Sequence, residues 1–113
     1  MPSKQRRDMR PSMEKVFRAL KVAIASHEVD EPDLANIMRH AWLYPGIPDL
    51  EQDVVAMNFP RPKGGGKRKT RIYMFDWVEA NTEESISQCL TEHVREDIAA
   101  GLLPRSPEGF DPR

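Results

Sequence analysis

Apolar residues recur at helical spacing in several parts of the chain and at strand spacing in one part. The first helical stretch covers residues 12–27 and follows Ser12, a residue type that favours the N-cap position. Its apolar positions are Met13, Val16, Phe17, Leu20 and Ile24. Spacings of three and four place these side chains on one helical face, so the pattern predicts an amphipathic helix.

A second helix is predicted from about residue 30. Asp30 is a suitable cap, Pro32 suits the first turn, and the acids here favour the positive end of the helix dipole. Leu34, Ile37, Met38 and Ala41 would form its inner face, and the Pro45–Gly46 dipeptide would end it. The next segment has mixed spacing, which predicts a short helix over 48–55 that runs into a strand ending at Phe59.

A second strand is predicted from the sequence RIYMFDWV, residues 71–78, which is rich in β-branched and aromatic residues. Alternation would place Tyr73, Phe75 and Trp77 on one face. Together the two strands predict a long hairpin over 55–78. Three glycines, residues 64–66, lie between its strands and predict a loose tip.

A last amphipathic helix is predicted over 82–102. Asn81 or Thr82 would cap it, with Glu84 placed as in a capping box. Its stripe at intervals of four consists of Ile86, Leu90, Val94, Ile98 and Leu102. The predicted fold class is therefore α+β: three N-terminal helices, a long β-hairpin and a C-terminal amphipathic helix. One domain would span 12–103, between a flexible basic arm at 1–11 and a disordered tail at 104–113.

Charge is segregated along the 113 residues, although the net charge is only −1. Residues 1–22 hold seven Lys or Arg against two acids, and residues 60–72 hold six against none. The intervening and final blocks are acidic: residues 23–59 hold seven acids against one Arg, and residues 73–113 hold nine against three basic residues. A polyanionic partner responds to such a local basic patch rather than to the net charge. The simpler explanation of the two basic blocks is a tail and a loop that are only solvated.

The sequence offers little for catalysis or for cofactor binding. The stretch RPKGGGKRKTR, residues 61–71, lacks the first glycine and the hydroxyl residue of a phosphate-binding loop, and a strand follows it rather than a helix. The three histidines, His27, His40 and His93, are scattered without zinc-helix spacing. Cys89 lies one helical turn before His93 but within an apolar stripe, where a buried and inert thiol is expected. We therefore expect no enzyme activity, no metal and no cofactor.

Four consecutive stretches, MEKVFRALKVAIA, PDLANIMRHAWL, IPDLEQDVV and AMNFPRPKGGGKRKTRIYMFDW, resemble a winged helix-turn-helix domain in element order. The resemblance implies three helices and a hairpin wing, with the third helix in the major groove and the basic wing tip on phosphates or in the minor groove. The chain departs from it at Asp49, Glu51 and Asp53, because acids on a recognition helix would repel a duplex. The wing and arm would then make the contact, or the fold would bind protein instead.

The favoured function is a small non-enzymatic nucleic-acid-binding protein, a regulator or accessory factor, with DNA favoured over RNA. The expected phosphate contacts are Lys63, Lys67, Arg68, Lys69 and Arg71 in the hairpin, and Arg6, Arg7 and Arg10 in the arm. The alternative is a protein-interaction module, such as an adaptor, an inhibitor or a small subunit, that docks through its acidic blocks and basic hairpin. A homodimer through the C-terminal helix is slightly favoured over packing of that helix onto the domain.

The expected location is intracellular and cytoplasmic, or nuclear if the protein is eukaryotic, with no membrane partner. A single cysteine suits a reducing compartment, and no apolar run approaches the roughly 18 residues that span a bilayer. The basic N-terminal stretch has no apolar segment behind it, unlike a secretory signal.

Overall fold

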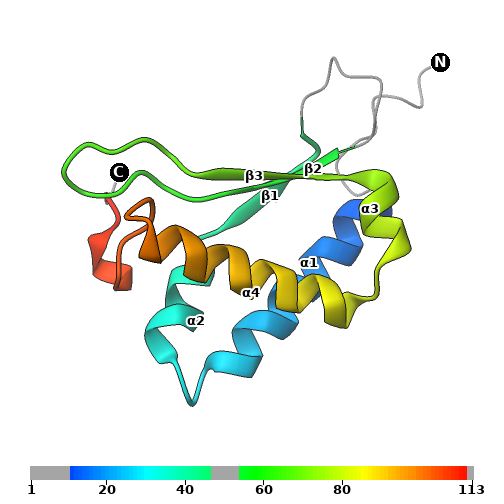
Figure 1. Cartoon of the computed structure of the whole chain (residues 1–113), viewed down its shortest axis with the longest axis horizontal. Coiled ribbons are helices and arrows are strands. Elements are labelled where there is room, and N and C mark those ends of the chain that lie inside the picture. Colours follow the sequence, from blue (N-terminus) through cyan, green and yellow to red (C-terminus); the bar gives the residue numbers. More distant parts are fainter. Residues whose placement is uncertain (1–10, 47–53, 112–113) are drawn as a thin grey trace.

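The computed structural model describes residues 11–46 and 54–111, which form a three-stranded antiparallel sheet and four α-helices. This is the α+β class that the sequence predicts. The elements in chain order are α1 (Pro11–His27), α2 (Pro32–Met38), β1 (Trp42–Tyr44), β2 (Val54–Asn58), β3 (Thr70–Met74), α3 (Phe75–Ala80) and α4 (Glu83–Ala99) (Figure 1).

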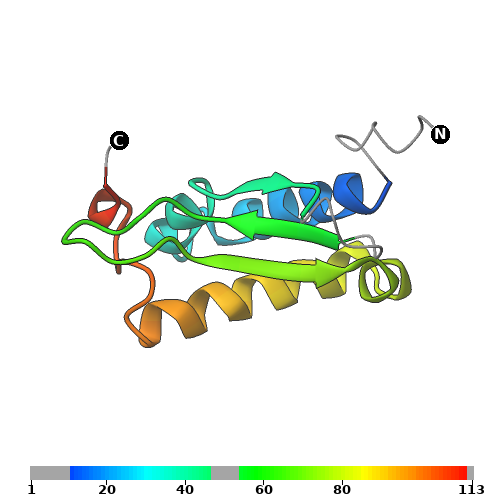
Figure 2. The ribbon, with the colours of Figure 1, turned by 90° about the horizontal axis from the view of Figure 1, so that it is seen from above.

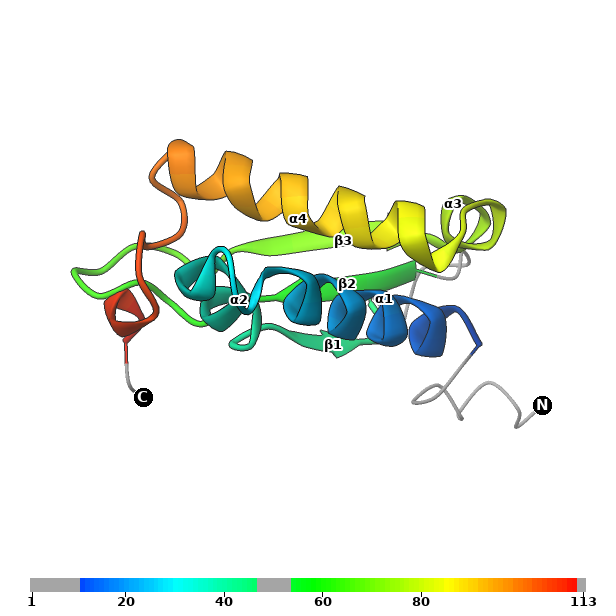
Figure 3. The same ribbon diagram turned by 90° about the horizontal axis from the view of Figure 1, so that it is seen from below.

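The molecule has two layers. The strands lie in the order β1-β2-β3, and α1, α2 and α4 lie on one side of them (Figure 1). Seen from below, α1 and α4 run side by side across that face of the sheet (Figure 3). Seen from above, no described helix lies over the opposite face, which we call the open sheet face (Figure 2). Within residues 11–46 and 54–111, one surface of the sheet therefore has no covering helix.

The core lies between the sheet and the helices. Alternate strand residues point into it, among them Val55, Met57 and Tyr73, because successive side chains in a strand face opposite sides. Ala19 and Ala23 of α1 are fully buried, whereas Phe17, expected on the inner face, is 44% exposed. Small residues on the inner face of α1 allow a close approach to its neighbours.

The first two helices correct details of the sequence prediction. Helix α1 matches the expected range, but it begins at Pro11, so Ser12 lies inside the helix rather than at its cap. Pro32 lies in the first turn of α2 as expected, but the N-cap is Glu31 and not Asp30. It ends at Met38, and residues 42–44 pair with β2 as strand β1 instead of continuing the helix. Pairing with a buried strand outweighs the weak helical spacing of this segment.

The predicted hairpin is confirmed in its strands: β2 and β3 pair antiparallel across a long loop, residues 59–69. Strand β3, the second strand of the hairpin, ends at Met74, earlier than predicted. Phe75–Ala80 form helix α3. The predicted helix over 48–55 lies mostly outside the described residues, and its last two positions, Val54 and Val55, belong to β2. The aromatic run of 71–78 therefore divides between a strand and a helix.

Helix α4 is capped by Thr82, which forms a capping box with Ser85 rather than with Glu84. Its apolar stripe packs inward: Ile86, Leu90 and Val94 are fully buried in the core of the same chain. The expected homodimer through this stripe is therefore wrong for these positions, because their side chains already have intramolecular partners.

Residues 104–111 pack against the rest of the chain, which corrects the prediction of disorder for this part of the 104–113 tail. Pro107–Gly109 form a 3₁₀ turn, and Phe110 is 5% exposed beside Phe59 and His40. The tail also bonds to the hairpin loop, since the Lys63 amide donates to the Gly109 carbonyl at 2.8 Å. The composition of the tail suggested disorder, but one buried aromatic ring and backbone bonding hold it in place.

Candidate functional site

The open sheet face exposes a group of large apolar side chains. Trp42, Tyr44, Ile72 and Met74 are 40%, 38%, 49% and 36% exposed. The strand register places Tyr44, Ala56 and Ile72 in one row and Val54 beside Met74 in the next, all on the same face. Contiguous exposed apolar residues of this kind mark interaction surfaces in soluble proteins.

The central strand explains the shape of this face. Its outward residues Val54, Ala56 and Asn58 are buried, although no described helix covers them. Ala56 lies between Tyr44 and Ile72, Asn58 lies between Trp42 and Thr70, and Val54 lies beside Met74. The exposed surface is therefore made by the two edge strands.

A polar pair lies at one end of the open sheet face. Asn58 lies opposite Trp42 on one side and Thr70 on the other. The Thr70 hydroxyl donates to Asn58 Oδ1 at 2.7 Å, whereas Asn58 Nδ2 is buried and has no hydrogen-bond partner among the described residues. A buried donor without an acceptor is uncommon, so this amide has unused hydrogen-bonding capacity next to the exposed indole.

The hairpin loop brings cations to the same face. The guanidinium carbon of Arg68 lies 5.6 Å from the centre of the Trp42 ring. Lys63 and Lys67 are exposed, and neither side chain contacts an acid within the described part of the chain. Gly64 and Gly65 adopt φ values of 92° and 96°, a region that other residues rarely enter, and they form the turn between the two lysines. Three of the five expected hairpin cations are therefore available to a ligand.

The other two cations are held by helix α4. Arg71 donates to Asp97 Oδ1 at 2.9 Å, and Lys69 Nζ lies 3.7 Å from the same oxygen. Asp97 is 3% exposed, and its hydrogen bond raises the pKa of Arg71 above its usual value. Lys69 and Arg71 therefore join the base of the loop to α4, so the loop is less loose at this end than the sequence predicts.

Among the described residues, the strands and the hairpin loop differ in charge from helices α3 and α4. Residues 42–46 and 54–74, which contain the strands and the loop, hold six Lys or Arg and no acid. Helices α3 and α4 hold seven acids and a single basic residue, Arg95. The described strands and loop are thus basic and helices α3 and α4 acidic, whereas α1 in the helix layer carries three Lys or Arg and one acid.

Sequence reasoning missed the exposed aromatics of β1 and could not place the arm. The expected contacts Arg6, Arg7 and Arg10 lie outside the described residues. Trp42 and Tyr44 were interpreted as the end of a helix, although two aromatic residues directly before a Pro-Gly turn favour a strand. Of the expected aromatic row, Tyr73 is buried and stacks on Trp77 with ring centres 5.4 Å apart.

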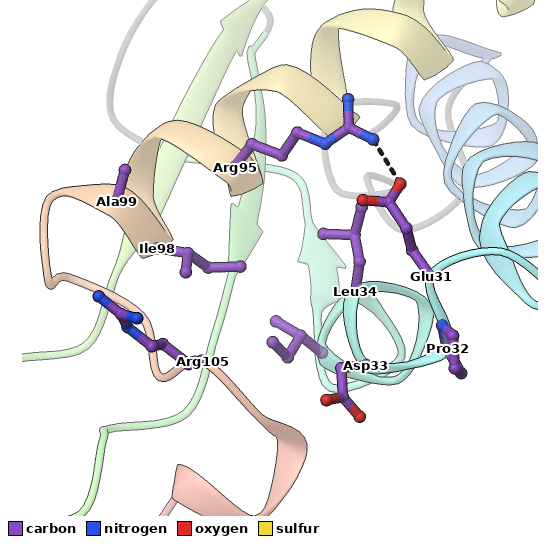
Figure 4. A pocket seen from close by; sticks show the side chains of 9 residues that line it. Glu31, Pro32, Asp33, Leu34, Arg95, Ile98, Ala99 and Arg105 are labelled. Atoms are coloured by element: carbon purple, nitrogen blue, oxygen red, sulfur yellow. Dashed lines mark hydrogen bonds and ion pairs between the residues drawn. The ribbon is translucent and has the colours of Figure 1, made fainter.

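A separate cavity of about 470 Å³ lies on the helix side, between α2, α4 and the C-terminal turn (Figure 4). Leu34, Ile37 and Ile98 supply its apolar wall. At its mouth Arg95 bonds to Glu31, so these two charges compensate each other. Asp33 and Arg105 add one negative and one positive charge to the lining. Because the charges balance, the cavity favours neither an anionic nor a cationic ligand.

No arrangement for nucleophilic or metal chemistry stands out in the described residues. Burial raises the pKa of the Cys89 thiol, which keeps it protonated near neutral pH. His93 stands beside Glu96 and the Tyr73 ring. Within 11–46 and 54–111, no three His, Cys, Asp or Glu side chains are grouped to hold a metal ion.

Comparison of the chain with protein-family models, with curated proteins and with solved structures finds no match. None of the described helices is both long enough and apolar enough to cross a membrane.

Proposed function

We propose that this chain is a small, non-enzymatic nucleic-acid-binding protein of the cytoplasm, a regulator or accessory factor. One observation supports this most: the open sheet face exposes Trp42 and Tyr44 beside a loop whose accessible side chains include cations and no acid. Phosphates would contact Lys63, Lys67 and Arg68. Binding through the strands and loop needs no recognition helix, so this proposal does not depend on the winged-helix resemblance. That resemblance stays a prediction.

The separation of charge supports a polyanionic ligand. The described strands and loop carry cations and no acid, and the acids of α3 and α4 lie outside them. The nearest acid of the tail is Asp111, whose amide bonds to the Arg61 carbonyl of the loop. Each phosphate that a lysine or arginine neutralises releases condensed counterions. Affinity should therefore depend strongly on salt.

A salt titration with DNA and RNA oligonucleotides tests the proposal. The wild-type protein should bind with an affinity that falls linearly on a log–log plot against salt concentration. The triple variant Lys63→Ala/Lys67→Ala/Arg68→Ala should bind more weakly, with a slope smaller by about 2 to 3, since each lost phosphate contact removes roughly one unit.

The matched control removes the same number of cations from the helix layer: Arg18→Ala/Lys21→Ala/Arg95→Ala. These side chains lie on α1 and α4 and are exposed, so their loss should leave the slope unchanged. Equal effects of both triple variants would mean that only the net charge matters, and would overturn the assignment to the loop.

The second candidate function is protein docking, which the exposed Ile72 and Met74 favour, together with the acidic surface of α4. An absence of nucleic-acid binding at about 50 mM salt, where such contacts are strong, would favour it. Recovery of one partner from the native cell at a fixed ratio, lost when Ile72→Ser is introduced, would then support it.

A further inference from the structure

We infer that the nucleic acid bound on the open sheet face is single-stranded, with unpaired bases stacked on Trp42 and Tyr44. This inference rests on the proposed function and specifies the class of ligand. An exposed indole and phenol offer flat apolar surfaces that match the faces of bases. In a duplex these faces are covered by neighbouring bases, so only an unpaired strand can use such side chains.

The spacing of the two aromatic residues supports this choice. Trp42 and Tyr44 are two residues apart in β1, so both point to the open sheet face, and their backbone positions are about 6.6 Å apart. Successive bases in a duplex are about 3.4 Å apart along the helix axis. Bases that occupy both side chains must therefore be separated from each other, as they are in an extended single strand.

The cations are placed to accompany a base at Trp42. Arg68 already lies against this ring, so the phosphate next to a base stacked there would meet a guanidinium group. Lys67 precedes it in the loop and is exposed. The same stretch of surface thus offers an aromatic plane and positive charge, the combination that binds single strands without strong sequence preference.

Asn58 provides a second, independent observation. Its Nδ2 atom is buried without an acceptor among the described residues, and its strand partner across β1–β2 is Trp42. Base carbonyls and ring nitrogens are hydrogen-bond acceptors. After a small movement of the side chain, the Asn58 amide could donate to one of them. An apolar protein surface would leave this donor without a partner.

A second copy of the chain matches this face less well. The described strands and loop of its own open sheet face carry the same cations and no acid, so face-to-face pairing would join like charges. A polyanion with aromatic bases complements both the charge and the apolar side chains. We therefore take an unpaired strand as the occupant, with the second copy as an outcome that the experiment detects.

The experiment compares thymine oligonucleotides of about 12 nucleotides with a duplex of equal length, at one salt concentration. Binding is followed by fluorescence in a Trp77→Phe background, so that the signal comes from Trp42. The expected result is tighter binding of the single strand, with quenching of Trp42. Trp42→Ala and Tyr44→Ala, measured by anisotropy of a labelled strand, should each weaken binding about 5- to 150-fold, whereas Trp42→Phe keeps most of the affinity.

The matched control is Phe17→Ala, which removes an exposed aromatic ring from the helix layer and should leave affinity unchanged. Equal affinity for strand and duplex without Trp42 quenching would overturn the inference and leave the proposed function standing. Failure to bind either ligand at low salt would overturn both. Self-association that Trp42→Ala abolishes would show that a second copy occupies the face, and would also overturn the inference.

Discussion

Asp97 shows how a single residue decides which cations of the loop remain available. It is buried on α4 and accepts hydrogen bonds from Arg71 on β3, with Lys69 close by. The two cations it holds contribute to the fold, and the three it does not reach contribute to the candidate surface. From the sequence alone, all five appear equivalent.

Replacing Asp97 with alanine should destabilise the fold by about 3 kcal/mol, because it leaves the partly buried Arg71 without its acceptor. This is the low end for a broken buried pair, since the Arg71 side chain keeps 27% of its surface exposed. Urea denaturation measures the change. The control Glu92→Ala removes an exposed acid from the same helix and should shift stability by less than about 0.5 kcal/mol. Equal effects of the two variants would contradict a structural role for Asp97.

Tyr73 should make stability fall in alkaline solution. Burial raises its pKa far above the usual value, so the folded state keeps a phenolic proton that the unfolded chain loses above about pH 10. Its contribution is therefore complete below that pH and decreases as the pH rises. Burial also raises the pKa of the Cys89 thiol. Its deprotonation in the unfolded chain therefore lowers stability in the same way, beginning at a lower pH than for Tyr73.

The variant Tyr73→Phe isolates this effect. It removes a buried hydroxyl that has no hydrogen-bond partner in the described part of the chain, so stability at pH 7 should rise by about 1 kcal/mol. Stability above pH 10 should then decrease less steeply than in the wild type. Chemical denaturation at a series of pH values checks both results, and identical slopes for the two proteins would exclude Tyr73 as the source.

At the scale of elements, strong periodicity predicted structure well and weak periodicity did not. Helices α1 and α4 and the β2–β3 hairpin carry long apolar patterns with suitable caps or turns, and they appear where expected. The segments that were predicted wrongly are β1, α3 and the tail, each of which is only a few residues long. The conformation of β1 depends on its pairing with β2, that of α3 on where the sheet ends, and that of the tail on the burial of Phe110. Local sequence does not encode these tertiary contacts.

The same contrast holds for the candidate site. Composition located the basic loop, because six cations within a few residues are visible in any sequence. It could not show that Lys69 and Arg71 meet an acid some 26 residues later, nor that Trp42 faces outward beside Arg68. Both depend on the register between strands and on the packing of α4 against β3.

Phe110 should stabilise the hairpin loop as well as the core. Replacing it with alanine removes a buried ring next to Phe59 and should cost about 3 kcal/mol. The amide hydrogens of Lys63 and Asp111, which bond across the contact between loop and tail, should then exchange faster with solvent. The control is Leu102→Ala, because that side chain is 46% exposed. Unchanged exchange at both amides would show that the tail does not support the loop.

At the scale of the whole molecule, the two layers have separate roles. The helix layer supplies most of the core and includes the acidic helix α4, while the described part of the sheet layer presents cations and aromatic rings. The two layers are seen in Figures 1 and 2. The cations of the loop would attract an approaching polyanion and the acids of α4 would repel it before any specific contact forms.

The most direct test of this account is an NMR titration of the amide resonances with a thymine oligonucleotide. Shifts should cluster in β1, β3 and residues 63–68, and should be small along the solvent-facing side of α4. The largest changes are expected near Trp42 and Arg68. Shifts concentrated on α4 or around the cavity at Arg95, with the open sheet face unaffected, would contradict the account.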